Sequence, residues 1–254
     1  MQQLILDKLA AVEKEQGIRI LYACESGSRG WEFPSPDSDY DVRFIYVRPY
    51  SYYLSVMDRE YDLNFPISGD LDMYGWDLRK VLQLMRKSNT TPFEWVQSPI
   101  VYREEPDFRD SLWMLCQSYF SQISHIHHYL GIARGAMESF ENGNEIKIKK
   151  LFYILRPLLA AKWCLERTAI APMTIGPLMT LLPDALNKQV SDLIELKATA
   201  PESFIIPISD ELISYIDQEF ARISEASTLL KRDQFTADEL DAFFVRTIIR
   251  YDHQ

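Results

Sequence analysis

The stretch from Ala23 to Val47, ACESGSRGWEFPSPDSDYDVRFIYV, decides the fold. It begins at the end of an apolar run, residues 18–24, whose β-branched and aromatic residues predict a buried strand. Gly, Ser, Pro and Asp dominate residues 25–41, which predicts turn and loop. The next run, VRFIYV at 42–47, predicts a second strand. The stretch therefore consists of two strands joined by a polar loop.

Gly27 and Ser28 follow the first predicted strand directly. Glycine allows the backbone to turn sharply and to approach a ligand closely. If a helical turn begins here, its N–H groups and the Ser28 hydroxyl can hold phosphate oxygens. Arg29 can add a charge-assisted contact to the same anion. These residues predict a phosphate-binding turn.

Asp39 and Asp41 stand two apart where the second strand begins, so both side chains are expected on one face. Two adjacent carboxylates repel each other, and a divalent cation with a preference for hard oxygen ligands, Mg²⁺ or Mn²⁺, relieves that repulsion. The alternative interpretation is a polar surface turn, because Asp and Ser are common turn residues. A strand before Gly-Ser, a short polar spacer and Asp-x-Asp leading into another strand together favour a metal site.

This combination resembles the signature of the DNA polymerase β superfamily of nucleotidyltransferases, Gly-Ser and then, after about ten residues, Asp-x-Asp. GSRGW, SDYDVRFIYV, LDMYGWDLRKVL, SPIVY and KKLFYILRPLLAAKW resemble more closely a bacterial and phage subgroup of predicted nucleotidyltransferases, some associated with RNA-repair ligases. The resemblance runs from about Ala23 to Trp163. It implies a mixed sheet flanked by helices, bound metal ions, and transfer of a nucleoside monophosphate from an NTP. Gly27 and Ser28 would then contact the triphosphate, and Asp39 and Asp41 would hold the metals.

The superfamily usually adds a third carboxylate, and the local candidates are Asp62, Asp70, Asp72 and Asp77. Asp77 is expected to cap a helix, and Asp70 is expected in the turn after Gly69. Asp62 lies on a segment whose placement is open. Asp72 has apolar neighbours on both sides, which predicts a place inside a strand, and we expect it to be the third metal ligand. An exposed residue on a half-solvated sheet is the alternative.

Four further candidates for nucleotide binding lie in one predicted helix: Lys149, Lys150, Tyr153 and Arg156. Lys149, Tyr153 and Arg156 share a helical face by their spacing. They are expected to form a basic wall for triphosphate or acceptor, and the subgroup shows a similar pattern. A solvated amphipathic face with extended basic side chains is the other interpretation.

Strands are predicted early and helices late. The predicted helices after the early region cover 111–140, 144–168, 183–200, 208–227 and 236–250. This segregation predicts an α+β protein, with a polymerase β-like nucleotidyltransferase domain at 1–105 and a helical domain at 106–254.

Composition limits the remaining possibilities. The chain has 254 residues, a net charge of -10 and a pI near 5.0, which argues against broad non-specific binding of nucleic acid. No signal peptide or membrane-spanning segment is recognised, so a cytoplasmic protein is expected. Cys24, Cys116 and Cys164 form no zinc-finger spacing and are expected to be buried thiols.

Other residues are expected to have structural roles. His125, His127 and His128 lack a second cluster that would complete a metal site. Trp76 and Trp95 are better core anchors than base-stacking platforms.

The leading hypothesis is a metal-dependent nucleotidyltransferase that uses an NTP and Mg²⁺ or Mn²⁺. The expected acceptor is an RNA end, a small molecule or a protein hydroxyl. The alternatives are a catalytically silent nucleotide- or partner-binding module on the same fold, and a component of a toxin–antitoxin or defence pair. The sequence leaves the acceptor, the NTP and the oligomeric state open.

Overall fold

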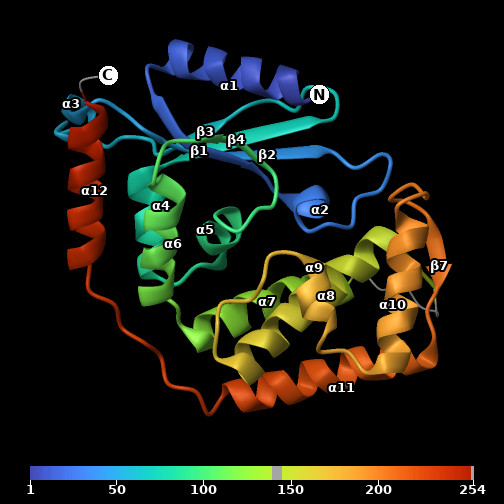
Figure 1. Ribbon diagram of the computed structural model, residues 1–254. Helices are drawn as coiled ribbons and strands as arrows, with labels where there is room; N and C mark the ends of the chain where they lie inside the picture. The colour runs from blue at the N-terminus through green and yellow to red at the C-terminus, as the bar shows by residue number, and fades with distance from the viewer. Residues whose placement is uncertain (139–144, 253–254) are drawn as a thin grey trace. The chain divides into compact units, whose positions relative to one another are not determined.

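The computed structural model describes residues 1–138 and 145–252, and most of its elements are labelled in Figure 1. The chain folds into two compact units. The first unit comprises Met1–Gly27, Asp39–Tyr119 and Gln234–Gln254, and the second comprises Ser28–Ser38 and Phe120–Asp233.

The predicted boundary between residues 105 and 106 falls inside the first unit. Helix α6 (Phe108–Ser118) and helix α12 (Asp238–Tyr251) both belong to that unit. The ring centroids of Phe108 and Phe243 lie 6.1 Å apart, so the two helices share an aromatic contact. The units therefore follow packing in space, which a single cut along the chain does not reproduce.

A five-stranded mixed sheet forms the centre of the first unit. Its strands are β1 (Arg19–Glu25), β2 (Tyr40–Val47), β3 (Asp62–Asn64), β4 (Leu71–Asp77) and β5 (Val101–Glu104), in the order β3-β4-β2-β1-β5. β2 and β4 run parallel, while the other neighbouring pairs are antiparallel. The predicted strands on both sides of the polar loop and the predicted mixed sheet are confirmed.

Helices complete the first unit. They are α1 (Gln2–Gln16), α3 (Tyr50–Tyr53), α4 (Leu78–Arg86) and α5 (Thr90–Trp95), with α6 and α12. Helix α1 buries Ile5, Leu9 and Val12 in the same apolar cluster as Phe44 of β2. Trp95 is also buried, and its ring centroid lies 4.4 Å from that of Trp76. Both tryptophans therefore pack with other aromatic rings, as expected of core anchors.

The second unit is largely helical. It contains α7 (Gln122–Met137), α8 (Ile148–Arg167), α9 (Ile175–Met179), α10 (Asp184–Lys197) and α11 (Asp210–Ser227). Most of α8 is buried, which makes it the central helix of the unit's apolar cluster. A small antiparallel sheet of two strands, β6 (Glu145–Lys147) and β7 (Ile205–Pro207), was not predicted.

Two predicted helices differ from the structure. The helix predicted over 111–140 is interrupted, because α6 ends at Ser118 and α7 begins at Gln122. The helix predicted over 144–168 begins only at Ile148, because strand β6 comes first. Residues 139, 140 and 144 of these predictions lie outside the described residues.

The cysteines and His125 occupy apolar surroundings. All three cysteines are buried without a disulfide, as predicted. Burial lowers the pKa of His125 to about 3, and its ring packs edge-on against Phe120 with 4.9 Å between centroids. A neutral imidazole among aromatic rings is consistent with a structural role. Within the described ranges, no helix has the length and apolar character required to cross a bilayer.

Asp77 ends β4 and caps α4, as predicted. Its carboxylate accepts a hydrogen bond from the Arg79 backbone N–H at 2.8 Å and another from the Tyr53 hydroxyl at 2.8 Å. The side chain is buried, and this burial raises the pKa of Asp77 from 3.8 to about 6.

The raised pKa of Asp77 predicts that the protein loses stability as the pH rises. A carboxyl group with a higher pKa in the folded state favours folding below its unfolded pKa, and this contribution is lost above its folded pKa. Between pH 4 and pH 8, wild type should lose about 2 kcal/mol of unfolding free energy relative to Asp77→Asn. Urea unfolding of both proteins at several pH values measures the difference. Parallel curves would contradict the assigned pKa.

Candidate functional site

Two carboxylates lie side by side on the parallel strands β2 and β4. Asp41 and Asp72 are direct register partners, and one nitrogen of Arg43, Nη2, donates to Asp41 Oδ1 and to Asp72 Oδ2, both at 2.7 Å. The other terminal nitrogen, Nη1, donates to the backbone oxygens of Asp72 and Val42 at 3.0 and 3.1 Å. The guanidinium therefore offsets part of the repulsion between the two carboxylates.

Arg43 is held between the strands while the carboxylates remain accessible. The side chain of Arg43 is 9% exposed, against 25% for Asp41 and 31% for Asp72. Its guanidinium carbon lies 4.0 Å from the centre of the Tyr74 ring, which adds a cation–π contact. The carboxylates are therefore partly open to solvent.

The backbone around Gly27 lies against Asp41. The N–H of Ser26 donates to the Asp41 carbonyl at 2.8 Å, and the N–H of Asp41 donates to Glu25 Oε1 at 2.7 Å. Gly27 has a φ of 57°, and a Cβ built there would lie 1.9 Å from Asp41 Oδ2. Only glycine allows the chain to pass this close to the carboxylate.

The donors at this site suit a divalent cation of the Mg²⁺ type. Asp41 and Asp72 supply hard carboxylate oxygens that already converge on one positive charge, and the absence of a Cβ at Gly27 lets the Asp41 carboxylate lie against the glycine turn. Among the described residues, no group of three or more His, Cys, Asp or Glu side chains is arranged to hold a metal. The fit therefore rests on the Asp41–Asp72 pair.

The other predicted carboxylates occupy different positions. Asp39 is exposed and directly precedes β2. Asp70 lies in the turn before β4, and its carbonyl accepts the Tyr40 N–H at 2.7 Å. The Asp62 carboxylate pairs with Lys80, and that of Asp77 caps α4. Asp72 is the candidate that shares Arg43 with Asp41.

The predicted phosphate-binding turn is a short helix, α2 (Gly27–Gly30). The Ser28 hydroxyl is buried and donates to the Ser38 hydroxyl at 3.0 Å. Arg29 Nη2 donates to the Ser38 carbonyl at 2.8 Å. Both predicted phosphate ligands therefore bond to Ser38, at the other end of the Ser28–Ser38 loop.

Helix α8 brings two of its predicted residues, Tyr153 and Arg156, to the same loop. Within the second unit, the Trp31 ring lies edge-on to Tyr153 with 5.4 Å between centroids, and the Arg156 guanidinium lies 4.5 Å from the Trp31 ring. Arg156 is only 2% exposed and donates to the Met173 carbonyl at 3.0 Å, so it does not belong to a solvated face. Lys149 pairs with Glu202, and Lys150 is partly exposed.

Arg43, Glu25 and Ser38 were missed by the sequence interpretation. Arg43 stands two residues after Asp41, so strand alternation alone could have placed it on the carboxylate face. Glu25 is fully buried and accepts a hydrogen bond from the Tyr102 hydroxyl. No local sequence signal marks Ser38 as the acceptor of Ser28, because serine is an ordinary loop residue.

Comparisons with known proteins identify the family of the chain. The family model of RlaP, the RNA repair pathway DNA polymerase beta family, matches residues 1–246. The chain belongs to this family. It is also 39% identical over 251 residues to the uncharacterized protein YcgL of Bacillus subtilis (strain 168), covering 98% of this chain and 96% of the relative. The resemblance to RNA-repair-associated polymerase β-like proteins is confirmed, and membership of RlaP indicates a nucleotidyltransferase-like protein of RNA repair.

The RlaP site provides a test of the third carboxylate. We expect Asp72→Asn to lower nucleotidyl transfer on the order of a hundredfold, because it removes one of the two charged carboxylates proposed to hold the metal. Asp70→Asn should leave transfer near wild type, because the backbone carbonyl of Asp70 makes the contact to Tyr40. Steady-state transfer rates of both purified variants decide the question. Loss of activity in Asp70→Asn alone would show that Asp70, and not Asp72, is the third carboxylate.

Proposed function

We propose that this RlaP protein transfers a nucleoside monophosphate from an NTP to a hydroxyl group at an RNA end. The register pairing of Asp41 with Asp72, with Gly27 packed against Asp41, is the observation that carries the proposal. A carboxylate pair beside a glycine turn is the arrangement that in-line nucleotidyl transfer needs for cation and phosphate. Membership of an RNA-repair family favours RNA as the acceptor.

The proposal assigns metal binding and triphosphate binding to different residues of this chain. Asp41, Asp72 and Asp39 would hold Mg²⁺ or Mn²⁺, which supplies charge neutralisation and lowers the pKa of the attacking hydroxyl. Gly27, Ser28 and Arg29 would bind the triphosphate. Lys149 and Lys150 would add positive charge to the triphosphate site, and Tyr153 and Arg156 would support it through Trp31.

Arg43 has a defined task in this scheme. Its guanidinium bonds to the two carboxylates that would hold the metal, so it preserves their geometry by supplying the opposing charge. Metal binding then requires Arg43 to give up at least part of these contacts. The strand register holds the carboxylates together while this exchange occurs.

The same observation favours a second candidate function. If Arg43 permanently replaces the metal between Asp41 and Asp72, the protein is a nucleotide-binding module without transfer activity. NTP would then bind without turnover. Binding and transfer must therefore be measured separately.

Transfer of radiolabel to RNA tests the proposed function. The purified protein is incubated with each of the NTPs labelled at the α-phosphate, with Mg²⁺ or Mn²⁺, and with RNAs that carry defined ends. Label that joins RNA only when metal is present supports the enzyme. Equilibrium binding of the same NTPs without label transfer to any RNA end would favour the silent module.

A further inference from the structure

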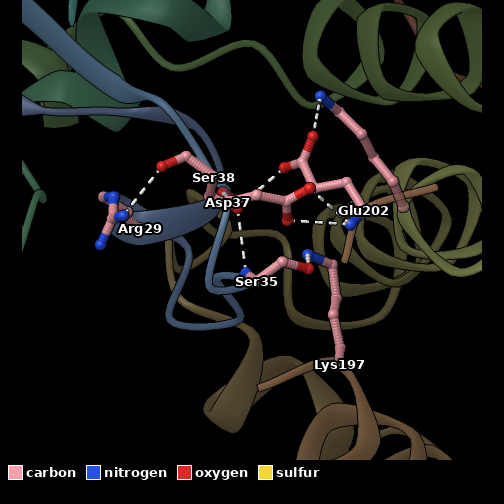
Figure 2. Close-up of polar contacts among 8 residues, drawn as sticks. Arg29, Ser35, Asp37, Ser38, Lys197 and Glu202 are labelled. Carbon is pink, nitrogen blue, oxygen red and sulfur yellow. Dashed lines mark hydrogen bonds and ion pairs between the residues drawn. The ribbon is translucent and has the colours of Figure 1, made fainter. Parts of the chain in front are cut away.

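A chain of hydrogen bonds links the phosphate-binding loop to residue 202 of the second unit. Ser38 Oγ donates to Glu202 Oε1 at 2.8 Å, and Lys149 Nζ pairs with Glu202 Oε2 at 2.5 Å. Figure 2 shows Glu202 facing Ser38, with Arg29 and Ser35 also bonded to Ser38. The carboxylate of Glu202 therefore contacts Lys149, a proposed triphosphate ligand. It also contacts Ser38, which bonds to Ser28 and Arg29.

The hydroxyl of Ser38 uses its full bonding capacity. It accepts from the Ser28 hydroxyl at 3.0 Å and from the Ser35 N–H at 2.9 Å, and it donates to Glu202. A serine hydroxyl has one proton and two lone pairs. Because a carboxylate only accepts, the Ser38 proton must go to Glu202, and the Ser28 proton must go to Ser38. Glu202 therefore sets the direction of proton donation along this series of hydrogen bonds, from Ser28 to Ser38 to Glu202.

Burial makes these bonds costly to lose. Ser28, Ser35 and Ser38 are 5%, 3% and 2% exposed, so their polar groups have little access to water. Without an acceptor at position 202, the Ser38 proton would need another partner, and it could turn towards Ser28. The two hydroxyls would then compete as donors, and the side chain of Ser28 would lose its single arrangement.

Neighbouring contacts hold Glu202 in place. Its backbone N–H donates to Asp37 Oδ1 at 2.9 Å, so the loop and residue 202 are joined in both directions. Lys197 is 1% exposed and donates to the Ser35 hydroxyl at 2.9 Å. Residues far apart in the sequence thus hold the loop from two sides, as Figure 2 shows.

We propose that Glu202 is a positioning residue for the triphosphate, acting through Ser38 on Ser28 and directly on Lys149. This inference rests on the proposed function. Glu202 itself does not bind the nucleotide, since an anion would repel it. Its effect is to hold the turn at Ser28 and the ammonium group of Lys149 in fixed positions, which lowers the ordering cost of binding.

Two substitutions at residue 202 separate positioning from simple charge. Glu202→Gln and Glu202→Ala both remove the negative charge, but only Gln retains an oxygen that accepts from Ser38. Binding of magnesium tripolyphosphate, measured by calorimetry, should be about tenfold weaker for Ala than for Gln. In transfer assays the same ratio should appear in KM for NTP, while kcat changes less.

Repeating both Glu202 substitutions in a Ser38→Ala background completes a double-mutant cycle. Ser38→Ala removes the Ser38 hydroxyl, so the part of the affinity difference between Glu202→Gln and Glu202→Ala that acts through Ser38 should disappear in that background. Glu166→Ala is the control, because it also breaks an ion pair in the second unit, with Arg222, without touching the loop. It should bind tripolyphosphate like wild type.

The outcomes distinguish this inference from the proposed function. Wild type that fails to bind tripolyphosphate overturns the triphosphate site and the positioning role with it. Wild type that binds, together with equal affinities of Glu202→Gln and Glu202→Ala, overturns the positioning role alone. If Glu202→Ala does not fold, Ser38→Ala takes its place in the comparison with Glu202→Gln, and equal affinities again overturn the role.

Discussion

Replacing Asp41 with Asn is expected to lower nucleotidyl transfer at least on the order of a thousandfold while the fold survives. Asn keeps the shape of the side chain but removes the charge that a divalent cation requires. The backbone groups of Asp41 still bond to Glu25 and Ser26, so the loop retains its anchor. Asp39→Asn is expected to act in the same direction, because the proposal assigns it to the same metal site.

Transfer of α-phosphate label and thermal unfolding are measured together for this test. Asp62→Asn is the matched control. Asp62 lies on β3, its carboxylate is ion-paired with Lys80 of α4, and β4 separates β3 from β2. This variant should retain wild-type transfer. A folded Asp39→Asn/Asp41→Asn double variant with wild-type turnover would refute the metal site.

Gly27→Ala is expected to be the second severe substitution. Its φ of 57° disfavours any residue with a Cβ, and the new Cβ would lie 1.9 Å from Asp41 Oδ2 and 2.8 Å from its Cγ. The carboxylate must therefore shift from the position in which it bonds to Arg43. We expect transfer to fall about a hundredfold through this displacement, since small misplacements at a reacting centre have effects of that size.

Gly17→Ala separates backbone strain from displacement of the carboxylate. Gly17 has nearly the same φ, 58°, but a Cβ built there meets no atom within 4 Å. Both variants should lose about 1 kcal/mol or more of stability from the left-handed backbone. Only Gly27→Ala should also lose transfer and weaken Mn²⁺ binding, which electron paramagnetic resonance measures directly. Equal activity of the two variants would show that Gly27 has no role beyond its turn.

Local sequence determined much of the fold around the site. Alternating and continuous apolar runs predicted β1 and β2, and Asp77 marked the beginning of α4 through its capping side chain. The apolar neighbours of Asp72 placed it inside β4, and Gly69 placed Asp70 in a turn. These predictions succeed because strands, caps and turns depend on residues close together in the chain.

Packing of distant residues decided features that these patterns do not contain. Arg156 was expected on a basic face, yet it is buried, and its guanidinium lies over Trp31 and donates to Met173. The spacing that defines a helical face says nothing about what covers that face. An arginine with a satisfied donor and an aromatic partner can be buried, and only the folded second unit supplies both.

Local patterns in the chain therefore specify a framework: a strand, a glycine turn, an Asp-x-Asp motif and a further strand carrying Asp72. The tertiary structure alone decided that Asp41 and Asp72 are register partners, that Arg43 bonds to both, and that Glu202 accepts from Ser38. The physical reason is that hydrogen-bond register and ion pairing are set by the three-dimensional approach of segments that are not neighbours in the chain.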